Sequence, residues 1–295
     1  MAGSRGMRNL LNVWDGKNRG QRLMQDFSAS PREMIASFAR NRRLISALIK
    51  REVLGRYRGS FIGILWSFLN PIFMLAVYTF VFSIVFKARW GTGSDSKTEF
   101  ALVLFAGLIM FNLFAECVGR APVAILANVN YVKKVVFPLE ILPWVNMGAA
   151  LFHMLVSVGV WLAAYSIFFG VPSITLLLLP LVIIPLILFI MGVSWALASL
   201  GVYFRDVSQF IGIVITVLMF MSPIFYPVTA LPEEYRGLLE FNPLTPAIEM
   251  AREVMFWRQL PDLLVLLQYY LGSLVIALLG FAWFQKTRKG FADVL

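Results

Sequence analysis

Charged side chains are scarce in this sequence and unevenly placed. Of 295 residues, 14% are Asp, Glu, Lys or Arg and 59% are hydrophobic, and the mean hydropathy is +0.77. A soluble domain carries about 25% charged residues. Residues 141–204 contain no charged residue at all, which suits about two membrane-spanning helices. The composition excludes an ordinary soluble fold and predicts an all-α integral membrane protein.

Cysteine and histidine are represented by one residue each. A single Cys117 excludes an internal disulfide and a cysteine-based metal site. His153 lies inside a predicted span, with no carboxylate or second histidine at helical spacing, and we interpret it as a packed, neutral side chain. Ionisable groups inside a membrane are nonetheless often functional. No metal site and no catalytic residues are predicted, so the chain is not expected to be an enzyme.

A nucleotide-binding motif is also missing. Residues 91–98 approach the P-loop pattern, but Ser96 stands where the second glycine is required. The segment also joins two predicted spans instead of a strand and a helix. We therefore predict that this chain binds no ATP and carries no motor of its own.

The net charge of +10 is concentrated near the N-terminus, where residues 1–60 hold 13 Lys and Arg against four acids. A basic block beside a first span is typical of a cytoplasmic segment that faces anionic lipid. The charge therefore indicates membrane lipids, and not nucleic acid, as the partner. The predicted cytoplasmic segments carry 20 Lys and Arg against six in the external ones, which predicts that both termini are cytoplasmic.

Four parts are predicted along the chain. Residues 1–30 are polar with little periodicity and are expected to form a mobile cytoplasmic tail. Residues 31–58 alternate apolar and basic side chains at helical spacing, which predicts an amphipathic interface helix with Ser30 as its N-cap. Residues 59–290 are expected to form a transmembrane domain of six spans, and residues 291–295 a cytoplasmic tail.

The six predicted spans are separated by charged or proline-marked segments. They cover residues 61–86, 100–116, 141–169, 174–200, 207–226 and 263–284. Pro71 is expected to kink the first span, and Glu116 and Arg120 are expected to pair because they lie four residues apart. Residues 229–262 are too long for a turn and too interrupted for a span. They are predicted to form short amphipathic or re-entrant helices near the outer surface.

The junction before the first span leaves two interpretations open. Gly55, Gly59 and Gly63 fall four apart, which permits either close approach of a second helix or a flexible entry into the span. Arg56 and Arg58 are suited to a pyrophosphate-linked lipid head, because guanidinium pairs with phosphate bidentately. They equally suit lipid anchoring or contact with a partner ATPase.

Several motifs follow one another in order between residues 30 and 295. They are Lys50-Arg51-Glu52, Arg56-Tyr57-Arg58-Gly59-Ser60, Leu65-Trp66, Asn70-Pro71, the run 128–143, Tyr203-Phe204-Arg205-Asp206, Asn242-Pro243-Leu244-Thr245 and Phe291-Ala292-Asp293-Val294-Leu295. Taken as a set, they resemble the permease subunit of bacterial polysaccharide-exporting type-2 ABC transporters, the family of O-antigen, capsule and teichoic-acid exporters.

That resemblance implies a homodimer with six spans in each protomer and two copies of a separate ATPase subunit, which holds ATP and Mg²⁺, on the cytoplasmic side. This chain itself would bind no cofactor. A loop helix at residues 121–137 would couple to the ATPase through Asn130, Tyr131, Lys133, Lys134 and Phe137. The cytoplasmic entrance and lipid-head site would comprise Arg51, Arg56, Tyr57 and Arg58. The residues expected to line the channel are Trp66, Phe73, Tyr78, Phe220, Phe225 and Tyr226.

The implied function is ATP-driven export of lipid-linked polysaccharide from the cytoplasm across the bacterial inner membrane. Aromatic rings suit such a path because they stack on the apolar faces of sugars without trapping the polymer. Two other classes stay open. A permease of this architecture for a small drug or lipid would have a narrow, aliphatic channel. An integral-membrane glycosyltransferase would need clustered acids, whereas the acids here are scattered over an external loop.

Overall fold

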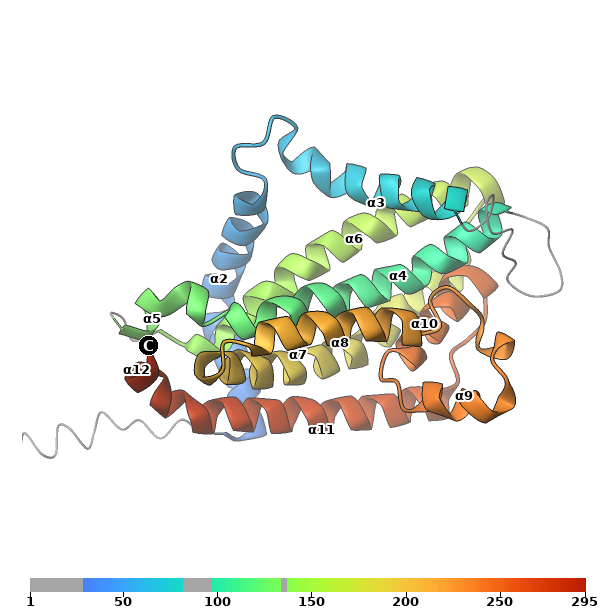
Figure 1. The fold of residues 1–295 in the computed structure, drawn as a ribbon. Helices are drawn as coiled ribbons and strands as arrows, with labels where there is room; N and C mark the ends of the chain where they lie inside the picture. The colour runs from blue at the N-terminus through green and yellow to red at the C-terminus, as the bar shows by residue number, and fades with distance from the viewer. Residues whose placement is uncertain (1–28, 82–96, 134–136) are drawn as a thin grey trace, which may run out of the picture.

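The computed structural model describes residues 29–81, 97–133 and 137–295, which form helices joined by turns and loops, with no strand among them (Figure 1). The α-helices are α2 (Pro31–Arg56), α3 (Trp66–Tyr78), α4 (Lys97–Arg120), α5 (Val129–Lys133), α6 (Leu142–Phe169), α7 (Leu179–Tyr203), α8 (Val207–Met221), α9 (Glu233–Glu240), α10 (Thr245–Arg252), α11 (Leu263–Thr287) and α12 (Phe291–Val294). The tail predicted at residues 1–30 lies almost wholly outside the described residues, as do residues 91–96 and Lys134.

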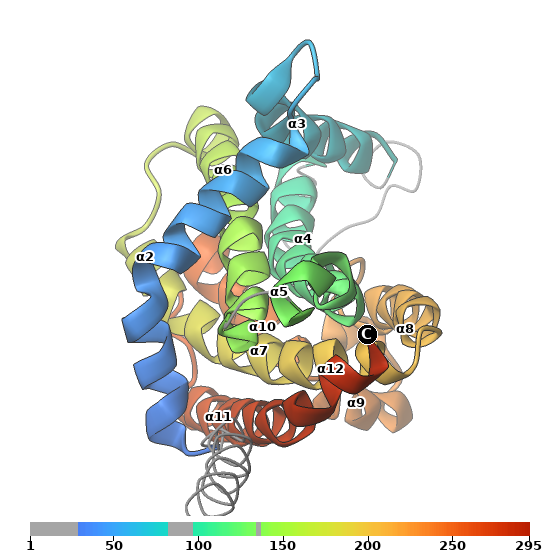
Figure 2. The same ribbon diagram turned by 90° about the vertical axis from the view of Figure 1, so that its left-hand side faces the viewer.

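The long helices lie side by side and define two ends of the molecule. In Figure 1, α3, α6, α4, α8, α7 and α11 run in roughly the same direction, with α2, α5 and α12 at one end and α9 and α10 at the other. Figure 2 shows α2 crossing the first of these ends, from the side of α11 toward α3. We call these the α2 end and the α10 end.

Five helical segments in the described part of the chain are long and apolar enough to cross a membrane. They are Gly63–Val81, Thr98–Val123, Leu139–Phe169, Ile174–Tyr203 and Leu263–Val294. The predicted span at 207–226 is shorter in the structure, because α8 ends at Met221 after 15 residues. At 1.5 Å per residue it is about 22 Å long, less than the ~30 Å hydrocarbon core.

Helix α4 forms the centre of the bundle, between two exposed helices. Of the 18 residues in its most apolar stretch, 83% are buried, against 6% in the corresponding stretch of α3. Helix α8 buries only Ile211. Two largely uncovered helices therefore flank a buried one. Such faces are typical of a contact with lipid, a partner chain or a substrate.

Helices α7 and α11 pack closely because small residues face each other. A Cβ atom on Gly280 would collide with the backbone of Gly192, and one on Gly192 would collide with the backbone of Ile276. Trp195 of α7 lies edge-on to Phe281 of α11 at 5.1 Å between ring centroids. Small-to-small contact of this kind drives helix association inside membranes, where the hydrophobic effect cannot.

Helix α2 begins where the sequence predicts a helix, with Ser30 as its N-cap. The Oγ of Ser30 accepts a hydrogen bond from the backbone N–H of Glu33 at 3.2 Å. One face of α2 packs Ile45 and Leu48 against the start of α6, while Ile35, 67% exposed, lies on the uncovered side. An amphipathic helix with an uncovered apolar stripe suits a membrane interface.

The junction after α2 is a turn. Gly59 and Gly63 have positive φ values of 86° and 60°, which glycine adopts without steric cost. No atom outside the glycine and its chain neighbours lies within 4 Å of a Cβ built on Gly55, Gly59 or Gly63, so within this chain they make no close helix contact. At the opposite terminus, residues predicted as a tail form the short helix α12, whose Phe291 is fully buried.

Candidate functional site

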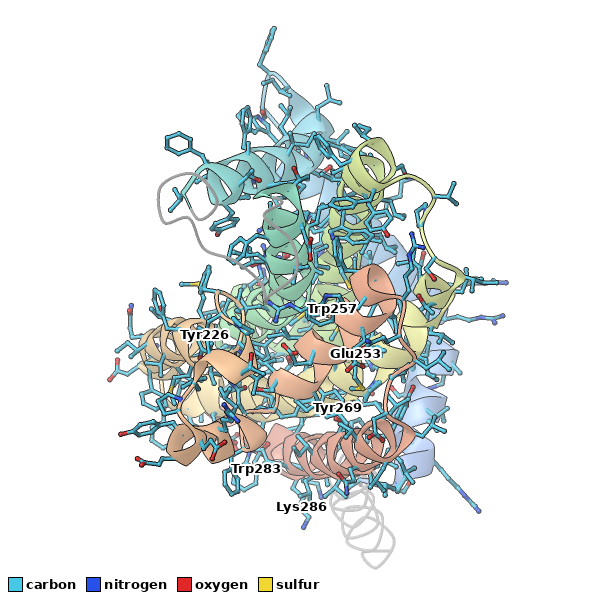
Figure 3. All side chains as sticks on the ribbon, turned by 90° about the vertical axis from the view of Figure 1, so that its right-hand side faces the viewer. Tyr226, Glu253, Trp257, Tyr269, Trp283 and Lys286 are labelled. Carbon is cyan, nitrogen blue, oxygen red and sulfur yellow. The ribbon has the colours of Figure 1, made fainter. Side chains whose placement is uncertain are left out.

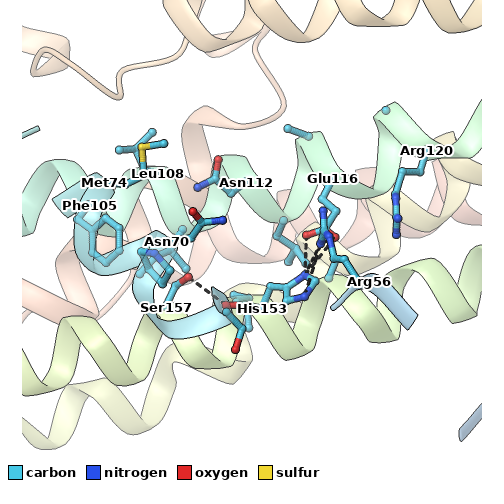
Figure 4. Close-up of a pocket in the computed structure, with 18 of the residues that line it drawn as sticks. Arg56, Asn70, Met74, Phe105, Leu108, Asn112, Glu116, Arg120, His153 and Ser157 are labelled. Atoms are coloured by element: carbon cyan, nitrogen blue, oxygen red, sulfur yellow. Dashed lines mark hydrogen bonds and ion pairs between the residues drawn. The ribbon is translucent and has the colours of Figure 1, made fainter. Parts of the chain in front are cut away.

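A cavity of about 500 Å³ opens between α3, α4 and α6 (Figure 4). Charged side chains lie at its α2 end, side-chain amides along its middle, and apolar side chains beyond them. The residues that define these three zones are Arg56, Glu116, Arg120 and His153, then Asn70, Asn112 and Ser157, then Met74, Tyr78, Phe105 and Leu108. Its volume falls within the ~300–1,000 Å³ typical of ligand sites.

A four-residue polar cluster closes the α2 end of this cavity. The guanidinium of Arg56 lies 2.5 Å from Glu116 Oε1, and Nδ1 of His153 lies 3.0 Å from Glu116 Oε2. The hydroxyl of Tyr57 lies 3.2 Å from Nε2 of His153. A carboxylate can only accept, so Nδ1 donates to Glu116 and Nε2 accepts from Tyr57. The cluster thus ties the end of α2 to α4 and α6.

One sequence-based expectation about this region is wrong. Glu116 pairs with Arg56 and His153 and not with Arg120, so His153 receives from another helix the carboxylate that it lacks at helical spacing. Arg120 instead pairs with Glu52 of α2 at 3.0 Å. Helical spacing misses these pairs because the partners come from different helices. Burial raises the pKa of the Tyr57 hydroxyl above its usual value, so it stays protonated and available as a donor.

The predicted entrance residues are split between this cluster and the surface. Arg56 and Tyr57 lie at the mouth of the cavity. Arg51 is exposed and donates to the hydroxyl of Tyr131 at 3.0 Å. Arg58 is also exposed, within the turn that follows α2.

Four of the six predicted channel aromatics gather near the α10 end of α3 and α8. Tyr78 contacts Phe225 with ring centroids 6.5 Å apart, and Phe220 lies 6.0 Å from Phe225. The hydroxyl of Tyr226 donates to the backbone carbonyl of Phe220 at 3.2 Å. The other two predicted aromatics, Trp66 and Phe73, are exposed along α3 and lie outside this group.

The described residues of the predicted coupling loop contact the end of α2 and the residue that follows α11, through bonds from Arg51 to Tyr131 and from Arg288 to Phe137. Tyr131 of α5 stacks on Phe137 at 4.3 Å between ring centroids, with an interplanar angle of 12°. Asn130 is exposed on the same short helix. Lys133 is the last residue of α5, and Lys134 lies outside the described residues.

A buried glutamate, which sequence inspection did not single out as a site residue, joins three elements beside that loop. Glu140 is 5% exposed, accepts from the hydroxyl of Ser37 at 2.8 Å and pairs with Arg288 at the end of α11. Arg288 also donates to the backbone carbonyl of Phe137 at 2.8 Å. Glu140 and Arg288 therefore join the segment after α5 to α2 and to the end of α11 through charge-assisted bonds.

At the α10 end a buried arginine fixes the segment where α8 stops. Arg252 has no exposed surface and donates to the backbone carbonyls of Pro223 at 2.6 Å, Ile224 at 2.9 Å and Val103 at 3.1 Å. Asn242 donates to Ser222 Oγ at 2.9 Å. Figure 3 views the molecule from this end, with Tyr226, Glu253 and Trp257 facing the viewer. The carbonyls of Pro223 and Ile224, in the non-helical segment 222–227, thus accept hydrogen bonds from a buried side chain.

Comparison with known proteins shows similarity to one transporter family and to curated permeases. The family model described as "ABC-2 type transporter" matches residues 43–256. A curated O-antigen export system permease protein RfbA of Klebsiella pneumoniae is 26% identical over 253 residues, which cover 85% of this chain and 95% of that protein. The protein of the same name from Myxococcus xanthus is 27% identical over 254 residues, with the same coverage.

Proposed function

Because the chain belongs to the ABC-2 type transporter family, we propose that it is the membrane-spanning subunit of an ATP-driven exporter of lipid-linked, O-antigen-like polysaccharide. The observation that carries this proposal is the match to two proteins named as O-antigen export permeases, each over 95% of the relative's length. In this assignment ATP and Mg²⁺ belong to a partner ATPase, and the chain performs no catalysis.

The proposed topology has six spans, with α8 and the segment after it as the fifth. Helix α8 alone is too short to cross, but the segment 222–227, of which residues 222–224 are buried, extends its path. Non-helical backbone is tolerated at membrane depth where protein satisfies its polar groups, which Arg252 does here for the carbonyls of Pro223 and Ile224. The buried helix α10 is then re-entrant, and the basic α2 end faces the cytoplasm in the bacterial inner membrane.

The proposed working unit is a homodimer with two ATPase subunits at the α2 end. The stacked pair Tyr131–Phe137 presents α5 to the ATPase, and the bond from Arg51 to Tyr131 passes its movement to α2. Since Arg56 at the end of α2 closes the cavity against Glu116, a shift of α2 would open the cavity toward the cytoplasm. ATP-driven movement would in this way control access of the substrate.

The proposed path leads from this mouth toward the aromatic group at the α10 end. Once a shift of α2 has released Arg56 from Glu116, Arg56 and the exposed Arg58 would contact the phosphates of the lipid-linked substrate, since guanidinium groups bind phosphate bidentately. Tyr78, Phe220 and Phe225 would support the glycan near the exit, where ring faces stack on sugars. A narrow aliphatic path, as expected for a small lipid or drug, does not suit this group.

The proposal is tested by deletion and rescue. We expect that deletion of this gene abolishes surface polysaccharide and leaves lipid-linked glycan inside the cell, and that deletion of the partner ATPase has the same effect. The Tyr131→Ala/Phe137→Ala variant should restore export poorly, whereas Tyr235→Ala, an exposed residue of α9 at the opposite end, should restore it fully. Normal surface glycan in the deletion strain would refute the proposal.

A further inference from the structure

Two side-chain amides lie in the cavity, at the middle of its length, with unused hydrogen-bonding capacity. Asn70 of α3 and Asn112 of α4 are both exposed and both line the cavity. Figure 4 shows the two amides in the space between α4 and the helices α3 and α6. In the described part of the chain neither amide group has a hydrogen-bond partner.

The position of Asn112 is unusual for its helix. From Phe100 to Arg120 it is the only residue whose side chain is exposed, in a helix that is otherwise the most buried of the bundle. Transfer of an amide group from water into hydrocarbon without a hydrogen-bond partner costs several kcal/mol of free energy, about 4–8 kcal/mol for transfer into cyclohexane. These amides therefore face water or a polar ligand, and not lipid tails, when the protein works.

The charges around the cavity indicate the class of ligand. Its two arginines are already engaged, Arg56 with Glu116 at 2.5 Å and Arg120 with Glu52 at 3.0 Å. The capacity that remains is neutral, since each amide offers both a donor and an acceptor. Neighbouring hydroxyl groups of a sugar match this pattern, whereas a phosphate would need free cations.

The apolar wall beside the amides fits the same ligand. The rings of Tyr78 and Phe105 and the side chain of Met74 line the cavity together with the amides. A sugar has hydroxyl groups around its edge and C–H groups on its faces, so amides and an apolar wall serve different parts of it. The volume of about 500 Å³ is within the range of small-ligand sites.

We propose that the cavity between α3, α4 and α6 is a binding site for an uncharged sugar unit of the exported glycan, held through its hydroxyl groups by Asn70 and Asn112. The proposal rests on the proposed export function and adds a defined sugar subsite to it. The subsite lies between the charged cluster of the mouth and the aromatic group near the exit. It would hold the polymer while the mouth closes behind it.

Cysteine labelling tests whether the amides face an aqueous site. In permease purified with its ATPase partner, Asn112→Cys should react with a charged methanethiosulfonate reagent. Leu155→Cys, whose parent residue is 63% exposed on α6, should react at least tenfold more slowly because a thiol in lipid is not ionised. The native Cys117 is buried and gives a low background. Equal, slow labelling of both cysteines, or a disulfide between two copies through Asn112→Cys, would overturn the proposal.

Protection by substrate then tests the ligand. Lipid-linked glycan extracted from the host should slow the labelling of Asn112→Cys. When Asn70→Leu is added to this variant, the glycan concentration needed for the same protection should rise about three- to tenfold, which is the effect of losing a neutral hydrogen bond. Asn146→Leu, an amide of α6 outside the cavity, is the matched control and should change nothing. Export that depends on the gene, together with no protection or no effect of Asn70→Leu, overturns the sugar site alone. Export that is independent of the gene refutes the proposed function itself.

Discussion

Replacement of Arg252 by methionine should destabilise the protein more than any other single removal of a charge. The guanidinium is fully buried and donates to three backbone carbonyls, two of which, those of Pro223 and Ile224, lie in non-helical backbone. A buried acceptor left without a donor costs about 1–3 kcal/mol. With two such carbonyls orphaned, we expect the free energy of unfolding to fall by about 2–6 kcal/mol.

The assay is reversible unfolding of the purified permease in mixed micelles with increasing mole fraction of a denaturing detergent. Arg252→Lys keeps the charge but not the planar fork of donors, and should fall between wild type and Arg252→Met. Arg258→Met, which replaces an exposed arginine of the same segment, residues 229–262, is the matched control and should change stability by less than about 0.5 kcal/mol. An Arg252→Met protein as stable as the control would refute the role assigned to these bonds.

Three further predictions concern the helix contacts. Gly280→Val should lower the free energy of unfolding by about 1–3 kcal/mol, because the new side chain would collide with the backbone of α7. Gly272→Val is the control and should lower it far less in the same detergent titration, because a Cβ at Gly272 meets no atom within 4 Å. Glu140→Gln removes the carboxylate partner of Arg288 and should lower stability by about 1–3 kcal/mol; wild-type stability would contradict this. Glu116→Gln should leave stability within about 1 kcal/mol but speed trypsin cleavage in the turn at 57–60, and unchanged cleavage would show that the cluster does not hold α2.

Local features of this chain could be predicted from sequence because they depend on neighbouring residues. The N-cap at Ser30 and the start of α2 at Pro31 follow from side-chain chemistry within four residues. The apolar runs predicted the long helices, since only a helix satisfies its backbone within a single segment in lipid. The helix of the predicted span at 207–226 ends early, at Met221, because the proline at 223 interrupts it. The carbonyl of Pro223 finds a donor in Arg252, 29 residues away.

The candidate site could not be predicted in the same way. His153 finds its partners 37 and 96 residues away, in Glu116 and Tyr57, and no helical spacing encodes such pairs. Asn70 entered the sequence argument only as part of a motif, and Asn112 not at all, because an isolated asparagine in an apolar run gives no sign of the face on which it lies. The cavity became visible only once α3, α4 and α6 were in place.

The most direct test of the central claim is transport by the purified complex in proteoliposomes. Permease and partner ATPase, loaded with lipid-linked glycan on the side of the ATPase, should move glycan to the opposite side only when ATP is supplied. The Tyr131→Ala/Phe137→Ala variant should reduce that movement, and Tyr235→Ala should not. Glycan movement without ATP, or ATP-dependent movement that persists when this chain is omitted, would contradict the account.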